Sequence, residues 1–122
     1  MNAEPQKLVT LNDFAARLQT NPGVFIVKLG AEWCGPCKRI EGLVHSCMDK
    51  APLNVQCEVI DVDESFEIYS FLKKNRVING IPAILAYYQG NVKHIPDDSV
   101  VGADANQVIA FFQRCYKHAE TK

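Results

Sequence analysis

Two cysteines separated by two residues, Cys34 and Cys37, lie between an apolar run and a helical pattern. The run Val24–Val27 is of strand length and rich in β-branched residues, and apolar residues recur at helical spacing after the second cysteine. The pair is therefore predicted to lie where a strand ends and a helix over about residues 34–50 begins. Because the N-terminus of a helix stabilises a thiolate, Cys34 is expected to be the attacking sulfur of a redox site. Cys37, one turn further along, is placed to resolve a mixed disulfide on Cys34.

Charge, hydropathy and cysteine number exclude several classes of protein. The formal net charge of −1 provides no basic field for nucleic acid or anionic lipid. No apolar run approaches transmembrane length, and the polar start Met1–Gln6 carries no apolar signal region. Five cysteines, an odd number, argue against an exported disulfide scaffold and for a reducing compartment. We expect one domain over residues 1–122 in the cytosol, with the mitochondrion as the alternative.

Strand and helix patterns alternate along the chain, which predicts an α/β fold with helices on both faces of a mixed sheet. Four helices are expected. The second is expected to begin at about Cys34, and the other three are predicted to be capped by Thr10 or Asn12, by Ser65 or Asp63, and by Asp104. A hairpin turn at Gln89–Asn91 is expected to lead into a short last strand. The other four strands are predicted at residues 7–10, 24–29, 54–62 and 81–88.

The motif Trp33-Cys34-Gly35-Pro36-Cys37-Lys38, together with Gly80-Ile81-Pro82, resembles the thioredoxin family over about the whole chain. The resemblance implies a five-stranded sheet. In that sheet residues 24–29 lie between 54–62 and 81–88, residues 7–10 lie beyond 54–62, and the short last strand lies beyond 81–88. It also implies that Cys34 attacks and Cys37 resolves. Gly35 and Pro36 close the turn between them, and a proline is tolerated in a first helical turn because its missing N–H is not needed there.

The second motif implies a docking surface for an extended substrate segment. In proteins similar to this one, the proline at the position of Pro82 follows a cis peptide bond and faces the dithiol. The backbone of Ile81 is then expected to pair with the substrate, and Gly102 to permit close approach on the other side. The alternative is a proline that begins an edge strand for structural reasons alone. The remaining residues implied for this surface are Trp33, Gly35 and Pro36.

Lys28 occupies the strand position where the family keeps a buried aspartate as a proton acceptor for the second cysteine. A charged Lys28 about 6 Å from a sulfur would stabilise a thiolate by roughly 2–3 kcal/mol and make the pair a weaker reductant. A buried lysine can instead lose its proton and act as a base. Asp61 is expected to be its counter-ion, since Asp61 shares a strand face with Val59, which aligns with a lysine of the family. The alternative is that Lys28 extends to the surface and plays no part.

The sequence therefore predicts a protein-disulfide oxidoreductase of the thioredoxin type, with no bound cofactor beyond the Cys34–Cys37 disulfide. The resemblance implies protein disulfides as substrates and an upstream reductase or dithiol as electron donor, and we expect a monomer with no nucleic-acid partner and no membrane span. The other three cysteines are expected to pack in the core, and no histidine has metal-ligand spacing to them. The alternative function is a binding module, or a dimer bridged by an iron–sulfur cluster or metal, with weak reductase activity.

Overall fold

The computed structural model describes residues 7–122, and residues 1–6 of the expected domain lie outside the described part. Helices and strands alternate along the chain, as the sequence patterns predict. In order they are α1 (Leu11–Gln19), β1 (Val24–Gly30), α2 (Gly35–Asp49), β2 (Val55–Asp61), α3 (Phe66–Lys74), β3 (Ala83–Tyr88), β4 (Asp98–Val101) and α4 (Ala105–Ala119).

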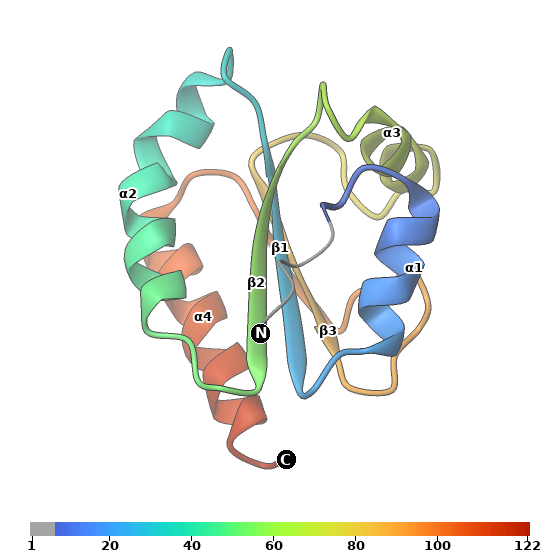
Figure 1. The fold of residues 1–122 in the computed structure, drawn as a ribbon. Coiled ribbons are helices and arrows are strands. Elements are labelled where there is room, and N and C mark those ends of the chain that lie inside the picture. The colour runs from blue at the N-terminus through green and yellow to red at the C-terminus, as the bar shows by residue number, and fades with distance from the viewer. Residues whose placement is uncertain (1–6) are drawn as a thin grey trace.

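The sheet is mixed and lies between two layers of helices, which confirms the predicted α/β class (Figure 1). Its strand order is β2-β1-β3-β4. β1 runs parallel to β2 and antiparallel to β3, and β4 is antiparallel to β3. Helices α2 and α4 cover one face of the sheet, and α1 and α3 cover the other (Figure 1).

Strand β1 is the centre of the molecule because all seven of its residues are buried. Successive side chains of a strand point to opposite faces, and β1 follows this rule. Phe25, Val27 and Leu29 belong to the core on the α1 and α3 side, whereas Val24 and Ile26 belong to the core on the α2 and α4 side. The same alternation turns Lys28 towards α2.

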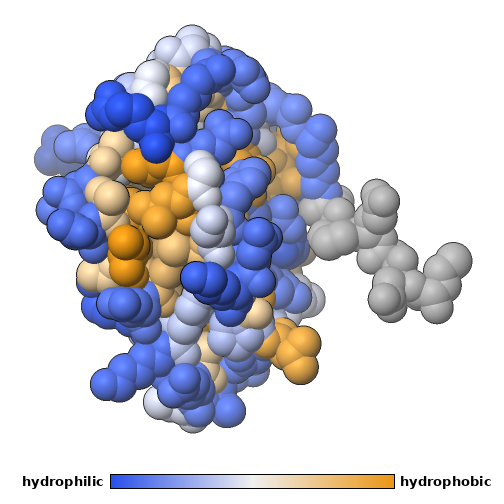
Figure 2. All heavy atoms as spheres, turned by 90° about the vertical axis from the view of Figure 1, so that its left-hand side faces the viewer, coloured by the Kyte–Doolittle hydropathy of each residue, from blue (hydrophilic) through white to orange (hydrophobic). Residues whose placement is uncertain are grey.

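The surface on the α2 side is largely hydrophilic, and an apolar patch lies among the polar side chains (Figure 2). No helix within residues 7–122 has the length and apolar character needed to cross a membrane.

Two of the predicted helix caps are confirmed in full. Thr10 caps α1 with a capping box in which its side chain accepts from the Asp13 N–H. Asp104 caps α4 by accepting from the Gln107 N–H at 3.0 Å. Ser65 stands at the N-cap of α3, but its side chain donates to the Leu8 carbonyl oxygen instead of capping the helix.

The predicted first strand, residues 7–10, is wrong, because this segment of the described chain is not part of the sheet. The N–H groups of Val9 and Thr10 both donate to the Asp13 carboxylate, at 3.0 and 2.9 Å, so they serve the start of α1. The carbonyl of Leu8 is engaged by Ser65. The described sheet therefore has four strands where five were predicted, and the predicted five-strand order is wrong at the edge, where β2 lies in place of residues 7–10; the four strands present lie in the relative order predicted for them.

The predicted turn at Gln89–Asn91 is present, with the Asn91 N–H donating to the Tyr88 carbonyl at 3.0 Å, but it does not lead directly into the last strand as predicted. Side chains close this loop where ladder bonds were expected: the Tyr88 N–H donates to the Asp97 carboxylate at 2.7 Å. The Asn91 amide donates to the Ile95 carbonyl at 3.0 Å and to Asp97 at 2.9 Å. The last strand, β4, consequently begins only at Asp98.

Candidate active site: a disulfide at the start of α2

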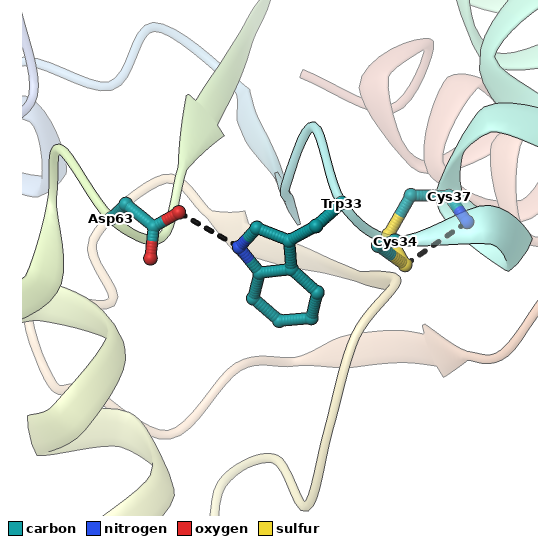
Figure 3. The surroundings of a disulfide bond; sticks show 4 residues. All are labelled: Trp33, Cys34, Cys37 and Asp63. Carbon is teal, nitrogen blue, oxygen red and sulfur yellow. Dashed lines mark hydrogen bonds between the residues drawn. A yellow bond between two sulfur atoms is a disulfide. The ribbon is translucent and has the colours of Figure 1, made fainter.

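The predicted cysteine pair lies where a strand ends and a helix begins. β1 ends at Gly30, a short turn follows, and Cys34 is the N-cap of α2, with a proline in the first helical turn. Cys34 and Cys37 form a disulfide, with 5.3 Å between their Cα atoms (Figure 3). The pair is thus placed by the turn after the buried strand β1 and by the first turn of α2.

The two cysteines have different surroundings. The Cys37 N–H donates to the sulfur of Cys34 at 3.2 Å (Figure 3). Cys34 is 6% exposed and Cys37 is 3% exposed, so the first cysteine is the more exposed of two residues that are nearly buried. A backbone N–H and the positive end of a helix dipole both favour negative charge on the sulfur of Cys34.

Trp33 is held beside the disulfide by a contact that the sequence did not reveal. Its indole N–H donates to the carboxylate of Asp63 at 2.8 Å, although the side chain is 66% exposed (Figure 3). Asp63 follows β2 and was considered only as a possible helix cap. Both residues lie just beyond the carboxyl ends of neighbouring parallel strands, and this placement is the signal that could have paired them.

The peptide bond Ile81–Pro82 is cis, as the resemblance implies. Leu29 pairs with Ala83 in antiparallel register. Pro82 therefore lies at the end of the sheet where β1 finishes and the chain turns to Cys34. Gly102 has a φ of +104°, a backbone conformation that favours glycine, and its N–H donates to the Pro82 carbonyl at 2.9 Å. The sheet therefore brings the two sequence motifs to the same end of the molecule.

Lys28 is 4% exposed and lies near Cys37. A β-carbon at Gly30 would be 3.5 Å from the sulfur of Cys37 and 3.8 Å from Cε of Lys28. The side chains of Lys28 and Cys37 therefore both lie close to Gly30. Lys28 and Cys37 also line the same cavity of about 750 Å³, which is bordered by charged residues of α2 and β2. Burial lowers the pKa of the Lys28 ammonium, and the negative charge of Glu41 opposes this shift.

Asp61 is not the counter-ion of Lys28, which corrects the sequence-based expectation. It lines the same cavity, but its carboxylate accepts from the N–H groups of Asp63 and Glu64, at 2.8 and 3.3 Å. The carboxylate whose charge acts on Lys28 belongs to Glu41. Glu41 lies four residues after Cys37 on α2, so helical spacing was the signal that could have identified it.

The other three cysteines are free thiols remote from this motif in the sequence. Cys115 is buried, and Cys47 and Cys57 are half-buried, in agreement with their expected packing in the core. Burial raises the pKa of the Cys57 thiol to about 11 and that of Cys115 to about 12. Thiols with such pKa values carry little thiolate at neutral pH.

A Cys-x-x-Cys disulfide at the head of a helix, with a cis-proline at the same end of the sheet, defines the class of thioredoxin-fold proteins with a dithiol–disulfide centre. Comparison with known sequences narrows the class. The sequence model described as Thioredoxin matches residues 5–114. The chain belongs to the thioredoxin family.

Relatives and solved structures agree with this assignment. The chain is 42% identical to a thioredoxin of Ophiophagus hannah over 62 residues, which are 49% of this chain and 57% of that protein. It is 27% identical to the mitochondrial thioredoxin of Bos taurus over 103 residues, 84% of this chain and 57% of that one. The matches thus span little more than half the length of these curated relatives. The structure of Plasmodium falciparum thioredoxin superposes with a TM-score of 0.69 at 25% identity, over 87% of this chain and 94% of that chain.

Proposed function

We propose that this chain is a protein-disulfide oxidoreductase that works through the Cys34–Cys37 pair. The observation that carries the proposal is the asymmetry of the pair at the start of α2: the sulfur of Cys34 accepts from the Cys37 N–H at 3.2 Å, and Cys34 is the more exposed of the two cysteines. Membership of the thioredoxin family and the intrachain disulfide favour this function over a binding module or a cluster-bridged dimer.

The reaction follows from the two positions. In the reduced protein, the Cys34 thiolate attacks one sulfur of a partner disulfide, forms a mixed disulfide and releases the other partner sulfur, which takes up a proton. The Cys37 thiol then loses its proton and attacks the sulfur of Cys34. The second partner thiol leaves, and the Cys34–Cys37 disulfide is restored. Two electrons pass from the chain to the partner, and a dithiol donor or a reductase must return them.

The partner is proposed to bind as an extended segment across the cis-proline. Among residues 7–122, the N–H and C=O of Ile81 have no hydrogen-bond partner, so both are free to pair with another backbone. Gly102 leaves space at the opposite side, since nothing lies within 4 Å of the position its β-carbon would take. Trp33, Gly35 and Pro36 are exposed and complete the surface.

Lys28 is proposed to be a positioning residue whose positive charge acts on the sulfur of Cys37. An ammonium in this poorly solvated place would favour the thiolate of Cys37. The test is a thiol titration of Lys28→Met, which keeps the length of the side chain and removes its charge. The pH midpoint for ionisation of the reduced cysteine pair should rise, and the thiolate fraction at neutral pH should be roughly tenfold lower. Lys38→Met is the matched control, because Lys38 follows Cys37 but is exposed and pairs with Glu32 at 3.5 Å. An unchanged midpoint in Lys28→Met would contradict the role of Lys28.

We propose that the protein acts as a monomer in a reducing compartment, the cytosol or the mitochondrial matrix, and needs no cofactor beyond its own dithiol. Three of its five cysteines remain as free thiols, which suits such a compartment.

The experiment on function is reduction of a protein disulfide, such as those of insulin, with a small dithiol as donor. The native chain should turn over, and Cys34→Ser should not. Cys47→Ser serves as the control, since Cys47 lies on the same helix but outside the site. Equal rates for the native chain and Cys34→Ser would overturn the proposal.

A further inference from the structure

A groove with a volume of about 740 Å³ lies between the end of α3 and the edge strand β4. It has an apolar part formed by Val77, Ile78 and Val101 and a basic part formed by Lys73 and Arg76. Val101 is 42% exposed although it is apolar, so part of the groove's wall is open to solvent. The groove is large enough for several side chains of a partner.

This groove continues the surface beside the cis-proline. Val101 pairs with Ala83, the residue after Pro82, and the next residue, Gly102, donates its N–H to the Pro82 carbonyl at 2.9 Å. The groove residues 77–79 also lead directly into the Ile81–Pro82 bond. An extended segment that crosses the cis-proline would therefore pass into the groove within a few residues.

Arg76 has a backbone conformation that arginine rarely adopts. Its φ is +60°, the only positive φ of a non-glycine residue in the described chain, and it directly follows the C-cap of α3. Helices usually end in glycine or asparagine at such a position, because a β-carbon there is unfavourable. Ending the helix does not require an arginine at this position, so the side chain of Arg76 is the feature that needs an explanation.

The cations of the groove have no acidic partner within the chain. In the part of the chain that the structure describes, no carboxylate lies within ion-pair distance of Lys73 or Arg76. The ammonium of Lys73 lies 5.6 Å from the centre of the Tyr69 ring, and Arg76 is exposed. Two unpaired cations next to an apolar wall complement a segment that carries carboxylates and apolar side chains.

We propose that this groove binds the residues flanking the attacked cysteine in a protein substrate, and that it selects segments with aspartate or glutamate there. The inference rests on the proposed function and adds the chemistry of the partner to it. The attraction between each cation and a substrate carboxylate is electrostatic and lies at the solvent-exposed rim of the contact. Each cation should therefore change the specificity for an acidic segment about two- to fivefold, and more at low salt.

The test compares two disulfide peptides that differ only in their flanking residues, one with aspartate and glutamate and the other with asparagine and glutamine. The readout is the ratio of kcat/KM for the acidic peptide to that for the neutral one. The native chain should give a ratio of about five or more at low salt, which decreases at high salt. Arg76→Gly and Lys73→Gln should each lower the ratio towards one.

The substitutions are chosen so that a loss of folding cannot explain a change in the ratio of kcat/KM. Glycine suits a φ of +60°, so Arg76→Gly should keep or raise the melting temperature while it lowers the ratio. Lys74→Gln is the matched control, because Lys74 is an exposed cation at the end of the same helix but does not line the groove. The ratio for Lys74→Gln should remain that of the native chain.

Binding of the same two peptides with serine in place of cysteine separates this inference from the proposed function. The acidic peptide should bind more tightly, and the difference should shrink in Arg76→Gly. Equal dissociation constants for the two peptides, or a ratio of kcat/KM that survives both groove substitutions, would overturn the inference. Absent turnover with both peptides, together with tighter binding of the acidic one, would instead count against the proposed function.

Discussion

The indole N–H of Trp33 donates to the carboxylate of Asp63 at 2.8 Å, and this bond joins the turn before the disulfide to the loop after β2 (Figure 3). The indole is 66% exposed, so the bond orients a ring that would otherwise be free in solvent. A partner that docks on the disulfide would then meet a preordered aromatic surface, at a lower entropic cost than a mobile one.

Asp63→Ala should therefore weaken substrate docking. A single exposed hydrogen bond is worth about 0.5–1.5 kcal/mol, so kcat/KM for disulfide reduction should fall about two- to tenfold. The fluorescence anisotropy of Trp33, which is the only tryptophan, should fall as the ring gains freedom. Asp63→Asn keeps an acceptor oxygen and should lie between the two. Unchanged anisotropy in Asp63→Ala would show that the bond does not order the ring.

Glu41 should influence the dithiol through Lys28. Its negative charge raises the pKa of the Lys28 ammonium against the lowering effect of burial. Glu41→Gln should therefore reduce the charge on Lys28 and raise the titration midpoint of the dithiol, in the same direction as Lys28→Met. Once Lys28 is replaced, Glu41→Gln should not raise the midpoint further. Additive upward shifts in the double variant would show that the two residues act separately.

Asn21 is buried, at 5% exposure, and connects α1 to the sheet. Its amide donates to the Tyr87 carbonyl at 2.7 Å, and its side-chain oxygen accepts from the Gly23 N–H at 3.1 Å. Asn21→Ala removes both hydrogen bonds and leaves the Gly23 N–H without its acceptor, whereas the Tyr87 carbonyl still faces Phe25 in the ladder between β1 and β3, so the free energy of unfolding, measured with urea, should fall by about 1–3 kcal/mol. Asn75→Ala is the control: that amide makes an exposed bond to Phe71, and its loss should cost less than about 1 kcal/mol.

Stability should decrease at alkaline pH because of two core thiols. The pKa of Cys57 is raised to about 11 and that of Cys115 to about 12, chiefly by burial, from an ordinary value of 9.0. Between pH 9 and 11 the folded chain therefore retains protons that the unfolded chain has lost, so the free energy of unfolding falls as pH rises. Each thiol contributes at most about 1.4 kcal/mol per pH unit.

Urea unfolding at several pH values from 8 to 11 measures this slope. Cys115→Ala should be less stable at pH 8 because it leaves a small cavity, but its stability should fall less steeply with pH. A slope identical to that of the native chain would contradict the assigned cause.

The sequence allowed the site to be located because its signals are local. The cysteine spacing, the proline in the first helical turn and the buried strand before it are all read within a few residues, and α2 begins as predicted, directly after Cys34. The cis bond at Pro82 was implied by a motif and is present. What joins these segments is non-local: the bond from Trp33 to Asp63 and the charge of Glu41 on Lys28 depend on which strands become neighbours.

The errors in the sheet have the same physical origin. Residues 7–10 have the composition of a short strand, but the Asp13 carboxylate binds two of their N–H groups and Ser65 binds the Leu8 carbonyl. In the loop before β4, Asn91 and Asp97 provide hydrogen bonds that a hairpin ladder would have made. Polar side chains competed with strand pairing in both places, and composition alone does not show where they bind.

The most direct test of the central claim is mass spectrometry of the Cys37→Ser variant after reaction with a protein disulfide. Without Cys37, a mixed disulfide on Cys34 cannot be resolved and should accumulate. We expect one covalently attached partner per chain, with the linkage at Cys34. Absence of an adduct, or attachment at Cys47, Cys57 or Cys115 instead, would contradict the assignment of Cys34 as the attacking sulfur.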